Sequence, residues 1–226
     1  MLLLATVLPS IIILFFFIFS DKFKEPKKSI IKVFFYGVLI TIPAYVLNSA
    51  FYDYFFYRTY ASEHLIGSFL TAAPLEEGLK FLVLFFLVYK MKDFNEPMDG
   101  IVYGVCVSLG FATLENFYYV YGIDWEGQSP MFVAWIRAFS AVPMHALAGC
   151  FMGYFFMKYS FVSKKDNLFF CFFIPFLLHG FYNLFASINT VALYGLLIIG
   201  WVVVLKLFGD LKKLQKLKKK EYEKKI

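Results

Sequence analysis

The sequence predicts an all-α membrane protein: a polytopic bundle of about seven transmembrane helices in a single domain. Of the 226 residues, 61% are hydrophobic and 22% are aromatic, well above the usage of a soluble domain. The charged residues make up 17% of the chain and gather between long apolar runs. These runs reach the roughly 20 residues that a helix needs to cross a bilayer. We therefore expect a multi-pass protein of a cell membrane.

Seven apolar runs supply the expected spans. The first starts at the beginning of the chain and lacks the basic region and cleavage site of a secretory signal, so we interpret it as a span. Pro43 predicts a kink in the second. Tyrosine and phenylalanine are frequent in residues 51–64, as in an interfacial aromatic belt. The expected spans are residues 2–19, 30–50, 65–89, 98–121, 131–157, 168–186 and 191–208.

The basic residues predict the orientation of the bundle. Successive loops carry four, one, two, none, three and none lysine or arginine residues, and the tail, about residues 210–226, carries eight. Cytoplasmic loops are the richer ones in membrane proteins. The alternation therefore places the N-terminus outside and the basic tail in the cytoplasm, where it anchors the topology. A short basic helix on anionic lipid headgroups is the alternative for the tail.

Charge and cysteine content exclude several other classes. The formal net charge is +6, and the tail alone contributes +5, so nothing in the rest of the chain favours nucleic-acid binding. The three cysteines, Cys106, Cys150 and Cys171, lie inside apolar runs without a CxxC spacing. Neither a disulfide framework nor a thiolate zinc site is expected.

The third expected span contains the most unusual stretch of the chain, residues 73–80, with Glu76, Glu77 and Lys80. Each charge costs about 2.5–3.5 kcal/mol or more to place at the centre of a membrane helix. Glu76 and Lys80 are four residues apart and are expected to pair on one helix face. Glu77 points about 100° away and needs another partner. Because a structural ion pair leaves Glu77 unexplained, a functional site is the favoured interpretation.

The next three spans carry further polar side chains within their apolar runs, and a proline stands shortly before three of the polar clusters. Counted from the outer ends, these side chains lie roughly 9–21 Å deep, so we expect them to meet in one cavity in the outer half of the bilayer. Asp99 and Arg137 lie near span ends and are left out of the predicted site. The predicted site residues are Glu76, Glu77, Lys80, Glu115, His145, His179 and Asn183, and the prolines are Pro74, Pro143 and Pro175.

Carboxylates and imidazoles in a cavity of low dielectric suit three tasks. A glutamate can act as general base on a water molecule. Histidine with asparagine can donate hydrogen bonds to a developing oxyanion. Alternatively, His145, His179 and a glutamate can bind a metal ion that activates water. The sequence leaves the metal-dependent and the metal-free mechanism open, and it contains no HExxH motif.

Four ordered motifs resemble those of the PrsW family of intramembrane proteases, and more distantly those of the CAAX-processing, glutamic-type intramembrane proteases. The resemblance covers over half of the chain, from the third to the sixth expected span. The motifs are Glu76-Glu77-x-x-Lys80, Phe111-x-x-x-Glu115-Asn116, His145-Ala-Leu-Ala-Gly149 and His179-Gly-x-Tyr-Asn183.

The resemblance implies a catalytic core at about residues 65–186 and assigns roles within it. Glu76 or Glu77 would activate water, with Glu76 as the first choice, and Lys80 would orient the two glutamates. Glu115 and His145 would hold the water or a metal, and His179 and Asn183 would polarise the scissile carbonyl. If a divalent metal such as zinc takes part, its expected ligands are Glu76, His145 and His179.

The resemblance also implies a substrate and a place of action. Family members are associated with cutting membrane-anchored anti-sigma factors on their extracytoplasmic side, as the first step of envelope-stress signalling. The chain would thus be an endopeptidase of the bacterial cytoplasmic membrane that acts on a single-pass protein within the lipid bilayer. There are two alternatives. One is a proton- or ion-coupled transporter, but the sequence does not contain the two related halves typical of that class. The other is a non-catalytic membrane scaffold.

Overall fold

The computed structural model describes residues 1–58, 62–162 and 165–223, with side chains up to residue 216. Residues 224–226 of the predicted basic tail, and the side chains of residues 217–223, lie outside this description. Every regular element in the described part is helical, which confirms the all-α fold, and four of them (η1–η4) are π-helical turns. The elements are α1 Leu2–Ser20, α2 Lys27–Phe56, α3 Glu63–Leu65, η1 Ile66–Ala72, α4 Ala73–Val83, η2 Leu84–Val88, α5 Pro97–Phe117, η3 Tyr118–Gly122, α6 Pro130–Phe139, α7 Ala141–Met157, η4 Lys158–Val162, α8 Asp166–Ile188 and α9 Thr190–Glu223.

Six helices of the described chain are long and apolar enough to cross a membrane. They correspond to six of the seven expected spans and are Leu2–Ser20, Lys27–Phe56, Pro97–Gly122, Pro130–Val162, Asp166–Ile188 and Thr190–Lys216. The third expected span is helical from Glu63 to Val88 through α3, η1, α4 and η2. It is not among the six, because Glu76, Glu77 and Lys80 make it too highly charged.

Helix α5 is the centre of the bundle, and almost all of its side chains are buried against α1, α2 and α7. Its approach to α7 is close because glycines face each other: a Cβ on Gly104 would meet the backbone of Gly149, and one on Gly149 would meet Gly104. Small residues of this kind allow close helix packing inside membranes. The central position of α5 brings Glu115, near its C-terminal end, between α4, α7 and α8.

The fifth expected span, residues 131–157, is interrupted at Ser140, which separates α6 from α7. Pro143 explains this difference, because a proline ring clashes with the carbonyl four residues earlier and offers no N–H to the helix. Pro74 stands near the start of α4, directly after the π-helical turn η1, whereas α8 continues through Pro175 and α2 through Pro43.

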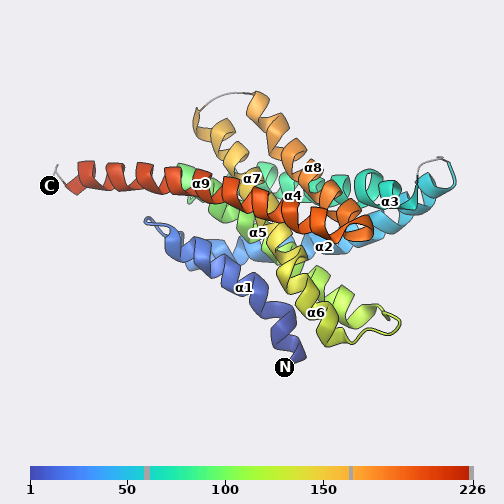
Figure 1. The fold of residues 1–226 in the computed structure, drawn as a ribbon. Coiled ribbons are helices and arrows are strands. Elements are labelled where there is room, and N and C mark those ends of the chain that lie inside the picture. The colour runs from blue at the N-terminus through green and yellow to red at the C-terminus, as the bar shows by residue number, and fades with distance from the viewer. Residues whose placement is uncertain (59–61, 163–164, 224–226) are drawn as a thin grey trace.

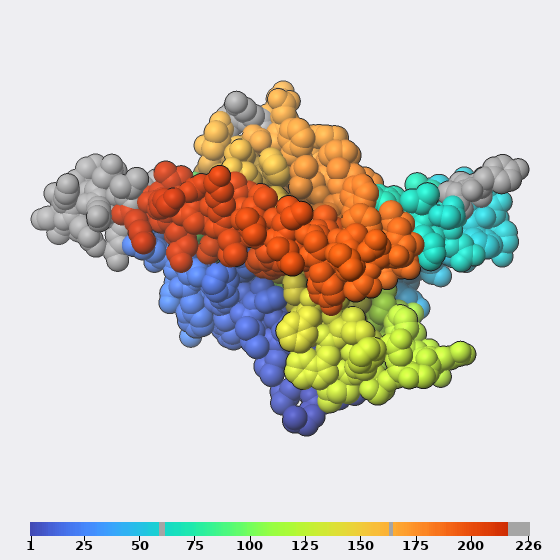
Figure 2. All heavy atoms as spheres, in the orientation of Figure 1, coloured from blue at the N-terminus to red at the C-terminus, as the bar shows by residue number. Residues whose placement is uncertain are grey.

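Helix α9 lies across one face of the molecule, over α7 and beside α8 (Figures 1 and 2). It continues beyond the expected seventh span into the basic tail, where Leu211 and Gln215 are buried. The Gln215 amide donates hydrogen bonds to Asp21 Oδ1 at 2.8 Å and to Glu96. The first turns of the tail are therefore packed onto the connections between α1 and α2 and before α5, and are not a freely solvated anchor.

Candidate active site

The charged residues of α4 are sealed inside the bundle. Glu77 and Lys80 have no exposed side-chain surface, and Glu76 is only 5% exposed. The Lys80 ammonium donates to Glu77 Oε1 at 2.7 Å, so the expected pairing of Lys80 with Glu76 is wrong. Spacings of three and four residues both allow a helical ion pair. The choice is made by a neighbouring helix, because Asn48 of α2 donates from Nδ2 to Glu76 Oε1 at 3.1 Å.

The two predicted histidines come together beside α4. The rings of His145 in α7 and His179 in α8 lie edge to face, with centroids 5.3 Å apart. His145 Nδ1 lies 3.0 Å from Lys80 Nζ, and its Nε2 lies 2.9 Å from Glu115 Oε2. Since an ammonium group only donates, Nδ1 is the acceptor and Nε2 carries the proton toward Glu115.

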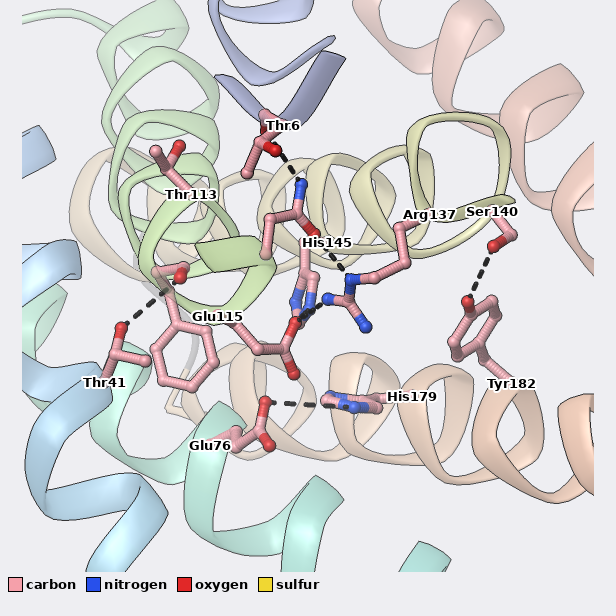
Figure 3. Close-up of polar contacts among 12 residues, drawn as sticks. Thr6, Thr41, Glu76, Thr113, Glu115, Arg137, Ser140, His145, His179 and Tyr182 are labelled. Carbon is pink, nitrogen blue, oxygen red and sulfur yellow. Dashed lines mark hydrogen bonds and ion pairs between the residues drawn. The ribbon is translucent and has the colours of Figure 1, made fainter. Parts of the chain in front are cut away.

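In His179 the proton is on the other ring nitrogen. Its Nδ1 lies 2.8 Å from Glu77 Oε1, a carboxylate oxygen that can only accept, so Nδ1 carries the proton. The lone pair of Nε2 is thereby left free. Nε2 lies 3.9 Å from Glu76 Oε2, a buried oxygen with no hydrogen-bond partner among the described residues. Figure 3 shows the Glu76 carboxylate facing His179 across this space.

Glu115 is held by a residue outside the predicted site. The Arg137 guanidinium pairs with Glu115 Oε2 and donates from Nε to Asn116 Oδ1 at 2.6 Å. It also lies over the ring of Tyr119, 3.9 Å from the centroid. In Figure 3 the second oxygen of Glu115 points toward Glu76 and His179. Arg137 therefore belongs to the site, and its depth in the fifth span, close to that of Glu115, is the sequence signal that could have identified it.

Asn48 is the second residue that the sequence analysis missed. No residue of the second span was predicted for the site, yet Asn48 of α2 contacts Glu76 directly. Asn183, in contrast, lies one turn beyond His179 in α8 without joining this network. Within the described residues no hydrogen bond links its side chain to the cluster, and its carbonyl accepts from Ser187 Oγ at 2.9 Å.

A cavity of about 1130 Å³ opens beside the cluster. It lies between α2 on one side and α5 with η3 on the other, with η1 and α4 at its inner end. Most of its lining is apolar or aromatic, but Asn48, Glu76 and Glu115 border it. The site thus combines buried carboxylates and imidazoles with a space large enough for a polypeptide segment.

The fold and this site define a polytopic helical membrane protein with the acid and imidazole groups of an intramembrane hydrolase. Comparison with known proteins gives the family. The model of the PrsW family intramembrane metalloproteases matches residues 25–208, and the chain belongs to this family. It is accordingly an intramembrane protease of a multi-pass membrane protein family. No solved structure shows significant similarity to the chain.

Bacterial relatives named Protease PrsW are similar over most of the chain. The relative from Geobacillus kaustophilus (strain HTA426) is 38% identical over 187 residues, which cover 79% of this chain and 76% of the relative. That of Oceanobacillus iheyensis is 35% identical over 208 residues, or 89% and 91% of the two chains. That of Bacillus subtilis (strain 168) is 36% identical over 187 residues, 79% of each.

A metalloprotease family implies a metal ion, and the donor set fits one. Glu76, His145 and His179 each offer a ligand atom, and these atoms lie within 4.8 Å of one another. The 3.9 Å between Glu76 Oε2 and His179 Nε2 is too long for a hydrogen bond but is less than twice a zinc–ligand distance of about 2.0–2.2 Å. Glu77 fixes the proton of His179 on Nδ1, as carboxylates behind zinc-bound histidines do. His145 would have to release one of its two polar contacts.

Proposed function

We propose that this intramembrane protease cuts a single-pass membrane protein near the extracytoplasmic edge of its membrane segment, with a divalent ion, zinc, held by Glu76, His145 and His179. The observation that carries the proposal is the buried group of these three side chains, one of which, Glu76, borders a cavity. Peptide hydrolysis needs an activated water and a bound, extended polypeptide, and this arrangement provides room for both.

The depth of the site supports cleavage at the outer boundary. In the proposed topology the segment from Glu63 to Val88 is the third of seven spans, and the basic loops and tail face the cytoplasm. The loop at residues 122–130 is then extracytoplasmic. Glu115 lies two residues before the end of α5, and η3 continues from there to that loop. Tyr118, Tyr119 and Tyr121 line the same end of the cavity, as aromatic side chains do at a membrane interface.

Each charged residue around the ion site has a separate role in this proposal. Glu76, His145 and His179 would hold the zinc ion, which when bound would supply polarisation of the scissile carbonyl and activation of water. Glu77 positions His179, and Lys80 neutralises Glu77 within the dry interior. Glu77 does not border the cavity, which argues against it in the role of base that the resemblance implies for Glu76 or Glu77. Among the two carboxylates that border it, Glu76 is a metal ligand in this proposal, and the base is Glu115.

Glu115 then acts first as a general base and afterwards as a general acid, with the same proton. It accepts a proton from water as the water oxygen bonds to the carbonyl carbon. It returns that proton to the amide nitrogen as the C–N bond breaks, which releases a carboxylic acid and an amine. Arg137 and His145 hold its other oxygen. The carbonyl-polarising role predicted for Asn183 stays a prediction, and so does a membrane-anchored anti-sigma factor as the substrate, which the family resemblance suggests.

The test uses purified full-length protein in liposomes and a pool of single-pass peptides with varied sequences at the outer membrane boundary. Mass spectrometry of the fragments should place the cut within a few residues of that boundary. A chelator should stop cleavage and zinc should restore it. Glu76→Gln should lose both activity and bound zinc, whereas Glu115→Gln should lose activity but keep the ion. Glu126→Gln, a change in an exposed loop residue, is the control that should retain both.

Two results would contradict this proposal. Cleavage that continues unchanged after complete removal of metal would exclude the zinc site. Fragments cut in the cytoplasmic half of the peptide would exclude the proposed depth and orientation.

A further inference from the structure

A seam in the wall of the cavity lies between α2 and the π-helical turn η3, where Tyr45 and Tyr118, which both line the cavity, face each other. Across it the hydroxyl groups of Tyr45 and Tyr118 are hydrogen-bonded at 2.8 Å, and the two ring centroids are 4.5 Å apart. Both side chains are exposed, Tyr45 by 51% and Tyr118 by 37%. In a membrane this outer surface faces lipid. Because this hydrogen bond is itself exposed, separating the two hydroxyls would widen the cavity toward the bilayer without breaking a buried hydrogen bond.

Inside the seam, Asn48 presents an unsatisfied acceptor. Its Nδ2 donates to Glu76 Oε1, while its Oδ1 is buried and has no hydrogen-bond partner among the described residues. Buried polar atoms are nearly always paired in native proteins. We therefore expect a molecule that enters the cavity to donate a hydrogen bond to this oxygen. Asn48 lines the cavity on the same side as Tyr45, one helical turn closer to Glu76 along α2.

A backbone N–H is the donor that a substrate polypeptide brings, but only when the segment is extended. In a helix the N–H groups are already bonded within the segment. An unwound segment in lipid must find replacement partners for these groups, and the Asn48 oxygen is one. The volume of about 1130 Å³ exceeds the usual range of about 300–1000 Å³ for small-molecule pockets, which agrees with a polypeptide occupant.

We propose that this cavity is the substrate cleft: an extended segment of a single-pass membrane protein enters from the lipid between Tyr45 and Tyr118, and one of its backbone N–H groups binds Asn48 Oδ1. Asn48 is then a positioning residue with two contacts. Through Nδ2 it fixes the Glu76 carboxylate, and through Oδ1 it sets the register of the substrate beside Glu76 and Glu115. This inference rests on the proposed proteolytic function and names where and in which conformation the substrate binds.

Photo-cross-linking tests the cleft without requiring cleavage. The full-length Glu76→Gln variant is placed in liposomes with a synthetic single-pass peptide that carries a Gly-Pro sequence at its outer boundary. A photoreactive phenylalanine analogue replaces Tyr45 in one sample and Tyr54 in the control. Tyr54 lies on the same helix and is equally exposed, 52% against 51%, but does not line the cavity. We expect at least tenfold more cross-linked peptide from position 45. Equal yields from the two positions would overturn the proposal.

A second measurement examines the Asn48 contact in the active enzyme. Peptides methylated at a single backbone nitrogen near the cut site lose one N–H at a time. Wild-type cleavage should drop at least tenfold in kcat/KM for one methylated position. Asn48→Leu should lower kcat/KM for the unmethylated peptide and remove the further effect of that methyl group. If the role of Asn48 is purely structural, the methyl group should lower kcat/KM by the same factor in both proteins, and this result would refute the contact.

The two measurements separate the inference from the function on which it rests. Cross-linking at position 45 without any cleavage by the wild-type protein would retain the cleft and contradict the proposed proteolysis of such peptides. Cleavage without the difference between positions 45 and 54 would retain the proteolysis and contradict the cleft.

Discussion

Glu77 accepts a hydrogen bond from Nδ1 of His179 at 2.8 Å, and neither side chain has more than 3% of its surface exposed. The same Glu77 oxygen accepts from Lys80. The two neighbouring glutamates of α4 therefore differ in kind. Each glutamate has one buried oxygen without a hydrogen-bond partner among the described residues, but Glu77 is held by both His179 and Lys80, whereas Glu76 borders the cavity.

The first prediction follows from this difference. Glu77→Gln leaves the Lys80 ammonium buried without a counter-charge, and breaking a buried pair in this way costs about 3–5 kcal/mol. Glu76→Gln breaks no ion pair shorter than 3.9 Å and should leave stability within about 1 kcal/mol of the wild type. Thermal unfolding in detergent at matched protein levels measures both variants, and both should be inactive.

A double variant supplies the control. Glu77→Gln combined with Lys80→Met removes both charges and should recover most of the lost stability, but not the activity, because His179 still lacks the negatively charged carboxylate partner that raises its basicity as a ligand. If Glu76→Gln proved as unstable as Glu77→Gln, the structural distinction between the two glutamates would be wrong.

The second prediction concerns Arg137. Arg137→Lys keeps the positive charge but cannot reproduce the planar contact that serves Glu115 and Asn116 together. We expect kcat/KM to fall at least tenfold, while the content of bound zinc stays unchanged, since Arg137 does not touch the proposed ligands. Cleavage assays and metal analysis of the same preparation decide this. Lys206→Arg, a basic exchange in the exposed part of α9, should change neither quantity, and zinc loss in Arg137→Lys would contradict the assigned role.

Local signals in the sequence predict the helices and most residues of the cluster. Long apolar runs determine where helices form, and the cost of a buried charge marks Glu76, Glu77 and Lys80 as residues that need partners. The partners themselves depend on tertiary packing. Whether Lys80 pairs at three or at four residues' distance was decided by Asn48 on α2 and His179 on α8.

Arg137 and the helix break at Ser140 show two further limits. Arg137 is close enough to a span end to reach headgroups; its depth matches that of Glu115, but only the tertiary packing shows that the two side chains meet. The break was predictable in principle from Pro143, but a continuous apolar pattern over residues 131–157 outweighed that single residue.

The third prediction concerns the end opposite the active site, where Gln215 ties the tail to the connection after α1. Burial raises the pKa of the Asp21 and Glu25 carboxyl groups. The folded state then binds more protons than the unfolded chain between the usual carboxyl pKa of about 4 and the raised value. The free energy of unfolding should therefore fall as the pH rises through this window. Melting temperatures across pH 4–8 should show this slope, and Asp21→Asn should flatten it.

Hydrogen exchange provides a separate measure of the same contact. Gln215→Ala removes the hydrogen bonds to Asp21 and Glu96 and should speed amide exchange in α9 around residues 208–216. Gln128→Ala, in an exposed loop, should leave that exchange unchanged. Unaltered protection of α9 in Gln215→Ala would mean that the tail is held by apolar packing of residues such as Leu211 alone.

The last prediction concerns the orientation of the chain, on which the outer position of the cut depends. The alternating loop charges predict that residues 122–130 lie outside and the basic tail inside. Gln128→Cys should react with a membrane-impermeant thiol reagent on intact cells, whereas Lys216→Cys should react only after the cells are permeabilised. Both positions are exposed, and the native cysteines Cys106, Cys150 and Cys171 are buried, so each signal reports the introduced thiol. Labelling of the tail but not of the loop on intact cells would invert the topology. The cavity mouth beside η3 would then face the cytoplasm, and the substrate would have to be cut on that side.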